Sequence, residues 1–267
     1  MAHPPLTQPH LTFAGVATVR PPHAVAVDCV AFLQWALPRL GRRWAGYRKV
    51  RRQVCRRVNR RAAELGLDSL AAYRGHLERH PDEWRVLDGL TNVTISRFQR
   101  DHGVFEFLQA ELLRPGLRIW SAGCANGEEP YTLALLCDCL EILATDVDPR
   151  LLRRAEAGRY PPSALRELPA ALREHAFTDG VLDPRVRRRV TFMRHDIRGE
   201  PPGGPFDLVL CRNLAFTYFD DPAQRATLTR IASVTAPGGA LVVGSHERLP
   251  AGQAEFENWA MGVYTLA

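Results

Sequence analysis

The stretch Ile119–Leu135, IWSAGCANGEEPYTLAL, decides the fold that we expect for this chain. Its apolar start predicts a β-strand, Gly123–Gly127 predicts a turn, and the residues from Glu128 onward predict a helix. Nineteen residues past Gly127, the run ILATDVD ends a second predicted strand at Asp146. Open α/β sheets bind nucleosides with such a unit, because the glycines let the backbone approach the ligand and the acid accepts the ribose hydroxyls. The stretch therefore predicts a nucleoside-binding site.

The acids after the turn indicate which nucleoside is bound. A dinucleotide turn has the pattern G-x-G-x-x-G, which seats a pyrophosphate at the helix N-terminus. Here Gly127 is followed at once by Glu128 and Glu129, and two carboxylates would repel a pyrophosphate. S-adenosylmethionine carries a sulfonium and an amino group and has no phosphate. We therefore expect S-adenosylmethionine as the cofactor and S-adenosylhomocysteine as the product. The alternative is a plain strand–turn–helix whose acids favour the helix dipole.

The composition predicts a globular protein. The chain has 267 residues, of which 46% are hydrophobic and 24% charged. No run reaches the roughly 18 apolar residues of a membrane span, so we expect no membrane association. Residues 1–23 lack the basic start and apolar core of a secretory signal, and we expect a flexible or wrapped extension there. The six cysteines and nine histidines show no metal-binding spacing, so we expect reduced thiols, no metal site and a cytoplasmic protein.

Two regions follow the extension. Residues 24–114 predict helices throughout, and thus a small all-α domain that ends in a loop and a last helix. Residues 115–267 alternate strands and helices, which predicts an α/β domain with a doubly wound, mostly parallel, Rossmann-like sheet. We expect helices over Val27–Leu40, Gly46–Leu65, Ser69–His80, Pro81–Leu90 and Val104–Leu113, strands over Arg118–Ala122, Ile142–Thr145, Val190–His195, Phe206–Cys211 and Ala240–Ser245, and a closing antiparallel hairpin within Phe256–Leu266.

A strongly basic segment lies in the helical region. Arg42–Arg61 holds ten basic residues and no acidic ones, within a chain of net charge +6. Its apolar residues recur at helical spacing, which predicts an amphipathic helix with an arginine-rich outer face. Such a face could meet an acidic protein helix, RNA or anionic lipid, or it could simply be solvated.

Several motifs together resemble the CheR family of chemotaxis receptor methyltransferases. SAGCANGEEPYTLAL is similar to the family's SAxxxxGEEPYS segment, and TISRFQRD to its TxFFR[DE] loop. ATDVDPRLLRRAEAGRYP, FDLVLCRNLAFTYFD and APGGALVVGSHERL resemble three further family motifs. The resemblance runs from about residue 27 to the end of the chain. It implies a class I methyltransferase that transfers a methyl group from S-adenosylmethionine to a carboxylate.

The resemblance also implies roles for single residues. Arg100 would meet the methionine carboxylate and, with Tyr218, would place the accepting carboxylate. The other residues implied at the cofactor are Thr94, Ser96, Gly123, Gly127, Glu128 at the amino group, Asp146 at the ribose, Asp196 and Ile197 at the adenine, and Arg212 and Asn213 below the methyl.

These residue types suit methyl transfer by in-line displacement. A carboxylate is already a nucleophile near neutral pH, so alignment in a dry pocket replaces a general base. Two alternatives remain open: Arg100 could form a structural salt bridge with Asp101 or Glu128, and Tyr218 could be a packed aromatic residue. His195 or His246 could act as a base if the acceptor were a hydroxyl or an amine.

The match departs from the family at three places. Gln99 replaces the second phenylalanine of the loop, which changes the expected lid over the cofactor. The run from Cys211 to Tyr218 is one residue longer than usual. Tyr160–Val190 is too short for the family's small antiparallel β-subdomain, and we expect a turn and at most one strand there, without a docked receptor tether.

Three functions therefore compete. The leading hypothesis is a carboxyl methyltransferase that acts on a protein glutamate or a small-molecule acid. A second is a protein that binds the cofactor as a sensor or scaffold without turnover, which a pocket blocked by Gln99 would favour. A third is an RNA methyltransferase that uses the basic helix, but that helix lacks interleaved surface aromatics, so we expect no nucleic-acid partner. A dehydrogenase fits the acidic turn poorly.

Overall fold

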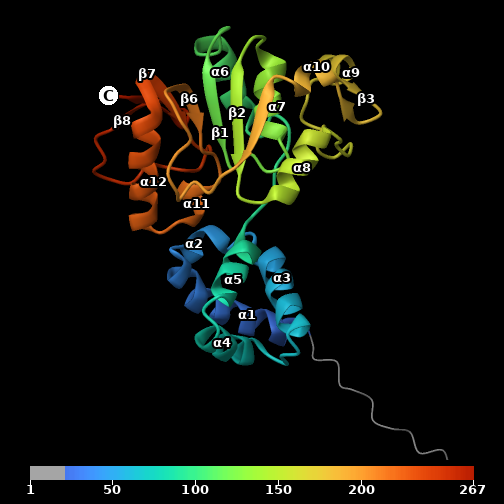
Figure 1. The fold of residues 1–267 in the computed structure, drawn as a ribbon, viewed down its shortest axis with the longest axis vertical. Helices are drawn as coiled ribbons and strands as arrows, with labels where there is room; N and C mark the ends of the chain where they lie inside the picture. The colour runs from blue at the N-terminus through green and yellow to red at the C-terminus, as the bar shows by residue number, and fades with distance from the viewer. Residues whose placement is uncertain (1–21) are drawn as a thin grey trace, which may run out of the picture.

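A computed structural model of the protein describes residues 22–267 and has a helical part and an α/β part. The extension expected at residues 1–23 falls almost entirely outside the described residues. Figure 1 shows helices α1 to α5 together at one end of the molecule and the sheet with its own helices at the other. The helices of the first part are α1 (Pro22–Ala36), the 3₁₀ helix η1 (Leu37–Leu40), α2 (Trp44–Tyr47), α3 (Arg51–Glu64), α4 (Leu70–Arg79) and α5 (Glu83–Thr91).

The predicted single helix Gly46–Leu65 is wrong, because the structure divides it into α2 and α3. Helix α2 lies against the α/β part: Gly46 approaches Thr217 so closely that a Cβ atom at Gly46 would collide with the Thr217 carbonyl oxygen. The chain turns after Tyr47 before α3 begins. Within α3 the predicted amphipathic pattern is confirmed, since Val54 and Val58 are fully buried while several arginines of the opposite face are exposed.

The cysteines of the helical part also differ from expectation. Cys29 of α1 and Cys55 of α3 form a disulfide, so the prediction of reduced thiols is wrong for this pair. The two helices pack side by side, which brings together residues 26 positions apart in the sequence. The remaining four cysteines are free: Cys124 and Cys211 are buried, and Cys137 and Cys139 lie nearer the surface.

The α/β part confirms the predicted Rossmann-like fold. In the described residues, seven strands form one sheet in the order β5-β2-β1-β6-β7-β9-β8, parallel except where β9 joins. Its strands are β1 (Arg118–Ala122), β2 (Glu141–Asp146), β5 (Val190–Arg194), β6 (Phe206–Leu210), β7 (Thr235–Val242), β8 (Phe256–Ala260) and β9 (Val263–Leu266). Its main helices are α6 (His102–Glu111), α7 (Glu128–Leu136), α8 (Pro149–Ala157), α11 (Ala215–Tyr218) and α12 (Asp221–Val234). The closing hairpin is β8–β9.

The central strand β1 is buried on both faces of the sheet, as expected for a parallel sheet covered by helices. Ile119 packs into one hydrophobic cluster and Trp120 into another, because successive side chains point to opposite faces. The Trp120 cluster continues without a break into the helical part. The carboxyl ends of β1, β2, β5 and β6 meet at one edge, which is where open α/β sheets bind ligands.

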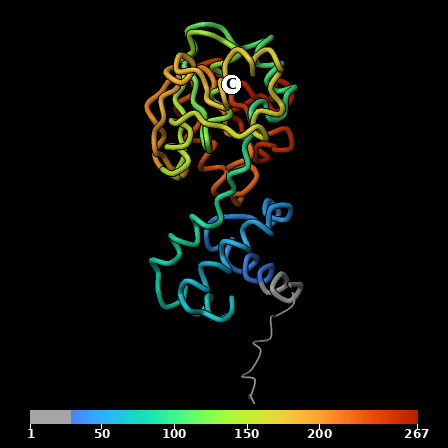
Figure 2. Tube along the Cα trace, turned by 90° about the vertical axis from the view of Figure 1, so that its right-hand side faces the viewer, coloured from blue at the N-terminus to red at the C-terminus, as the bar shows by residue number. Residues whose placement is uncertain are grey.

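The segment between the two parts packs with the sheet. After α5 the chain leaves the helical part along one extended stretch, which Figure 2 shows from the side. Phe98 and the α6 residues Val104, Phe105 and Leu108 are buried in the same cluster as Ile119. We therefore propose a domain boundary near residue 92 rather than at residue 114.

The insert before β5 forms more structure than the sequence predicts. Strands β3 (Phe177–Thr178) and β4 (Val181–Leu182) pair as an antiparallel hairpin, flanked by helices α9 (Ala170–Ala176) and α10 (Pro184–Arg187). The expectation of at most one strand is therefore wrong. No helix within residues 22–267 is long and apolar enough to cross a membrane.

Candidate functional site

A cleft opens at the carboxyl edge of the sheet, between the sheet and the helical part. It spans about 1050 Å³, open solvent at its mouth included, and is walled by the loop after α5, the turns after β1, β2, β5 and β6, and helix α11. Ten of the predicted site residues line it: Thr94, Ser96, Arg100, Gly123, Asp146, Asp196, Ile197, Arg212, Asn213 and Tyr218. Gly127 and Glu128 do not line it.

The turn after β1 brings backbone to the cleft wall. Gly123 has a φ of +74°, and a Cβ atom there would lie 2.5 Å from the Leu214 side chain. A larger residue would therefore be strained in its backbone and would push Leu214. The Gly123 amide donates to the Thr145 carbonyl over 2.7 Å. This bond holds the turn beside the end of β2, so Gly123 leaves room for a ligand against the strand ends.

Asp146 at the end of β2 presents its carboxylate to the cleft. One oxygen accepts from the Ala125 amide over 3.0 Å and the other from the Asp148 amide over 2.9 Å. Burial raises the pKa of Asp146, and these backbone bonds work against that rise. No cation pairs with Asp146 in the described part of the chain. Each oxygen keeps accepting capacity for the hydroxyls of a bound ribose.

Of the two acids that begin α7, it is Glu129 that lines the cleft. Glu129 accepts from the Ser121 hydroxyl over 2.7 Å and from the Arg212 guanidinium over 3.1 Å. Glu128 is only 3% exposed and lines a separate crevice. Neighbouring helix residues point about 100° apart, so only one acid of the pair can face a given wall. Glu129, and not Glu128, is therefore the acid of this pair that lines the cleft.

Arg100 carries a positive charge into the cleft without an acidic partner in the described chain. Its guanidinium donates to the Ile95 carbonyl over 2.8 Å and to the Asn213 side-chain oxygen over 2.9 Å. The alternative of a structural salt bridge with Asp101 or Glu128 is wrong: within the described residues Arg100 forms an ion pair with neither acid, and Asp101 pairs with Arg212 at 2.9 Å. Two of the five N–H groups of Arg100 are bound, and the rest can hold an anionic ligand group.

Arg212 organises the wall beneath Arg100. Its side chain is 2% exposed, donates to Glu129 and Asp101, and also donates to the Arg100 carbonyl over 2.6 Å. The guanidinium lies over the Phe105 ring at 5.0 Å. With both acids and the ring engaged, Arg212 is a positioning residue for Glu129 and for the loop that carries Arg100.

Glu247, which the sequence analysis did not assign a role, fixes the position of Asn213. It is 4% exposed, and its carboxylate accepts from the amides of Asn213 and Gly244 and from the Thr217 hydroxyl over 2.6–2.7 Å. Asn213 has a φ of +54°, in the left-handed region that asparagine enters more readily than most other non-glycine residues, and the bond from its amide to Glu247 fixes it there. In the sequence, the only sign of this role is that Glu247 lies in the GSHER segment, which resembles a family motif.

Tyr218 of α11 lines the cleft and also packs on the Tyr47 ring, with ring centroids 5.0 Å apart. Burial raises the pKa of Tyr218 to about 12, and the nearby Arg100 charge works against that rise. The phenol therefore stays protonated at neutral pH and can donate a hydrogen bond. Tyr218 thus combines the two alternatives from the sequence, because it is both a packed aromatic residue and a cleft residue.

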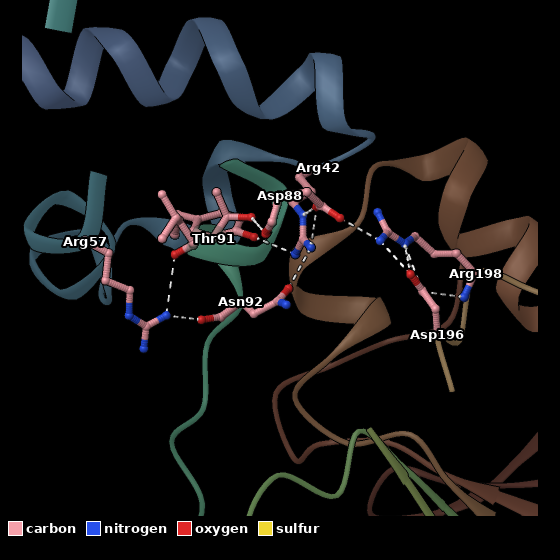
Figure 3. Close-up of polar contacts among 9 residues, drawn as sticks. Arg42, Arg57, Asp88, Thr91, Asn92, Asp196 and Arg198 are labelled. Atoms are coloured by element: carbon pink, nitrogen blue, oxygen red, sulfur yellow. Dashed lines mark hydrogen bonds and ion pairs between the residues drawn. The ribbon is translucent and has the colours of Figure 1, made fainter. Parts of the chain in front are cut away.

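The far wall of the cleft is a row of alternating charges that joins the two parts (Figure 3). Arg198 donates to both oxygens of Asp196, over 2.7–3.2 Å, and to Asp88 of α5 over 2.6 Å. Asp88 in turn accepts from Arg42 over 2.7 and 2.9 Å. Burial would raise the pKa of Asp196, but the Arg198 bonds outweigh it and the net shift is downward. Arg42 is thus buried in this row and does not belong to the exposed basic face.

Two other residues lie differently from expectation. Gln99 is buried away from the cleft. Its backbone N–H donates to the Thr132 hydroxyl, and its side-chain oxygen lies 2.9 Å from a His102 ring nitrogen. Gln99 therefore does not block the cleft, and the sensor hypothesis loses that support. His195 lines the cleft with one ring nitrogen 2.6 Å from the Glu200 carbonyl, whereas His246 is exposed outside it.

Both parts of the chain resemble known proteins. Residues 94–265 match the family model "CheR methyltransferase, SAM binding domain", and residues 49–87 match "CheR methyltransferase, all-alpha domain". The chain belongs to the CheR methyltransferase family. The boundary between the two matches falls at the extended stretch after α5, and the cofactor is S-adenosylmethionine.

Named relatives of this CheR-family chain are chemotaxis proteins. The chain is 36% identical over 185 residues to a "Probable chemotaxis protein methyltransferase" of Rhizobium etli, covering 62% of this chain and 68% of the relative. It is 32% identical over 218 residues to "Chemotaxis protein methyltransferase 2" of Pseudomonas aeruginosa, covering 73% and 77%. It is also 32% identical over 226 residues to an uncharacterized 104.1 kDa protein of Rhodobacter capsulatus, of which it spans only 24%.

The residues of the cleft fit S-adenosylmethionine. An uncompensated guanidinium, a carboxylate ready for hydroxyls and a second carboxylate, on Glu129, suit the carboxylate, ribose and amino group of the cofactor. Helix α7, which follows the Gly123 turn, begins with Glu128 and Glu129, and their carboxylates would repel a pyrophosphate at its N-terminus. The dehydrogenase alternative therefore has no support in the described geometry.

Proposed function

We propose that this CheR-family chain transfers the methyl group of S-adenosylmethionine to a carboxylate, on a protein glutamate or a small-molecule acid. The observation that carries the proposal is the pair formed by Tyr218 and Arg100. Both line the cleft, one as a protonated phenol and the other as a guanidinium without an acidic partner. A phenol and a guanidinium can each donate a hydrogen bond, which suits an acceptor that is already ionised.

The proposed mechanism is alignment in a closed site. S-adenosylmethionine supplies an electrophilic methyl group on a sulfonium. In our proposal Asp146 holds the ribose, Arg100 and Glu129 hold the two charged groups of the methionine, and Gly123 allows close approach. Arg100 and Tyr218 then orient the acceptor carboxylate for in-line attack, and the packed helical part excludes water. The wall residues that fix these groups are Arg212, which holds Glu129, and Glu247, which holds Asn213.

A protein acceptor is supported by the relatives, whose names describe chemotaxis protein methyltransferases. We propose a protein acceptor for this chain as well. The proposal of a protein acceptor does not depend on any residue outside the cleft.

The test is transfer of a labelled methyl group from S-adenosylmethionine to fractionated protein, RNA and small acids. The expected product is a methyl ester, which releases labelled methanol in mild alkali. The variant Tyr218→Phe keeps the ring that packs on Tyr47 but removes the hydroxyl donor. It should transfer less methyl than the wild type while it still binds S-adenosylhomocysteine. Alkali-stable label in RNA, or cofactor binding without transfer to any fraction, would overturn the proposal in favour of an RNA methyltransferase or a sensor.

A further inference from the structure

A second crevice lies beside the cofactor cleft, on the other side of the loop after α5. Ser96 and Arg97 line both hollows, so one short stretch of chain separates them. We call it the arginine crevice and define it by Ser96, Asn126 and Glu128 at its floor and by Arg154, Arg159 and Arg166 at its rim. None of these three arginines has a part in the cofactor cleft.

The rim carries positive charge that the chain does not neutralise. Arg154, Arg159 and Arg166 are exposed, and none pairs with an acidic side chain in the part of the chain that the structure describes. Arg97, their neighbour, is already paired with Glu167 at 2.9 Å. Three guanidiniums around one hollow favour an acidic ligand, and guanidinium geometry matches carboxylates.

The floor of the arginine crevice carries two acceptor atoms that lack a hydrogen-bond donor. Glu128 is 3% exposed, and its Oε2 atom has no hydrogen-bond partner among the described residues; the buried Asn126 Oδ1 atom lacks one as well. Burial raises the pKa of Glu128, and hydrogen bonding from its own backbone and from Ser96 and Asn126 works against that rise. Buried acceptors are rarely left without partners, because each orphaned group is costly.

The two demands together select the class of ligand. A free phosphate or a small carboxylate could pair with the rim but offers the floor no N–H group and is repelled by Glu128. A nucleic-acid backbone has the same defect. An acidic peptide offers both: its backbone amides can donate to Glu128 and Asn126 while its side-chain carboxylates meet the arginines.

We propose that the arginine crevice binds an acidic segment of the acceptor polypeptide, flanking the carboxylate that enters the cleft. The position of this segment next to the target rests on the proposed function, whereas the binding itself does not. Because Ser96 and Arg97 separate the two hollows, a few extended residues span from one to the other. The crevice would thus select targets that lie in acidic sequence.

The test measures binding of a fluorescent glutamate-rich peptide, with a glutamine peptide of the same length as its partner. The triple change Arg154→Gln, Arg159→Gln and Arg166→Gln should weaken the glutamate peptide about tenfold, with a loss that shrinks as salt is added. The matched control changes Arg153, Arg173 and Arg188 to glutamine, which removes the same charge from exposed sites outside the crevice. Glu128→Gln should weaken the peptide without changing S-adenosylhomocysteine affinity.

Each other outcome decides the matter. Equal losses in the two triple variants, equal binding of the two peptides, or displacement of the peptide by an RNA oligonucleotide from this crevice would overturn the proposal. Loss of S-adenosylhomocysteine affinity, and not of peptide, in Glu128→Gln would assign Glu128 to the cofactor and overturn it too. Arginine-dependent peptide binding with no methyl transfer to any acceptor would refute the proposed function while the crevice stands.

Discussion

Asp146 and Asp196 are the same type of residue at the ends of neighbouring parallel strands, yet their surroundings make them different groups. Asp146 accepts only backbone amides, has no cationic partner in the described chain, and its pKa is raised by burial. Asp196 is held at both oxygens by Arg198, and its pKa is lowered. The fold brings both carboxylates to the cleft, but Arg198, which also donates to Asp88 of the helical part, engages Asp196 and leaves Asp146 available to a ligand.

The largest difference between Asp146 and Asp196 should appear when each acid is replaced by its amide. Asp146→Asn should weaken S-adenosylhomocysteine about 100-fold, because hydrogen bonds from two hydroxyls to a charged acceptor are lost, each worth about 1.5–3 kcal/mol in full. Asp196→Asn should weaken it by less than about tenfold, because its oxygens are already engaged. Calorimetric titration of both variants measures this. Equal losses would show that the two acids do the same work.

The second prediction removes the contact that closes the Asp196 end. Asp88→Asn leaves Arg42, whose side chain is 5% exposed, without its counter-charge. We expect the free energy of unfolding to fall by about 2 kcal/mol, below the full value for a buried pair because Arg198 is partly exposed. Asp82→Asn is the control: Asp82 and Arg85 are both highly exposed, and the change should cost under about 0.5 kcal/mol. If urea unfolding gave the same loss of unfolding free energy for both variants, the row of charges would not stabilise the fold.

A third carboxylate, Glu247, differs from both aspartates because it positions Asn213 and does not line the cleft. Glu247→Gln replaces an oxygen that accepts from the Thr217 hydroxyl or the two amides by an amide group that cannot accept. Asn213 should shift, and Arg100 with it. We expect labelled methyl transfer to fall about tenfold, with a smaller loss of S-adenosylhomocysteine affinity. Glu257→Gln, at an exposed site on β8, should change neither. Unchanged transfer in Glu247→Gln would show that the bond to Asn213 has no part in alignment.

The smallest expected effect concerns pH. A ribose binds the ionised form of Asp146, so affinity for S-adenosylhomocysteine is full above the raised pKa of Asp146 and is lost as pH falls through it. Stabilisation by the Asp196–Arg198 pair is full above the unfolded pKa and is lost only as pH falls through the lowered folded pKa. As pH falls, binding should therefore weaken slightly before the folded state loosens. Asp146→Asn should remove that dependence. Simultaneous loss in the wild type would contradict the assignment.

Much of the fold followed from local patterns in the sequence. The glycine turn, the acid after it and the alternating strands predicted the parallel sheet and the closing hairpin, because each is encoded over a few consecutive residues. The two-stranded β3–β4 hairpin escaped because its strands have only two residues each, too few for a pattern. The disulfide escaped because helix packing, not spacing, brings Cys29 to Cys55.

The site was predictable in its strand-end residues and less so in its partners. Adjacent residues Glu128 and Glu129 look alike in sequence, and only the rotation of α7 decides which of them faces the cleft. In the same way, nothing in the arginine-rich run marks Arg42 as the one that meets Asp88, 46 residues later. Long-range pairing of charges depends on tertiary contacts that short motifs do not carry.

The central claim is that the cleft is built for a methyl donor and not for a dinucleotide. The most direct measurement is calorimetric titration of the wild-type protein with S-adenosylhomocysteine and, separately, with NAD. We expect one site for S-adenosylhomocysteine and no detectable heat of binding for NAD, since the Gly123 turn leads into carboxylates. Binding of NAD, or binding of neither compound by folded protein, would contradict it.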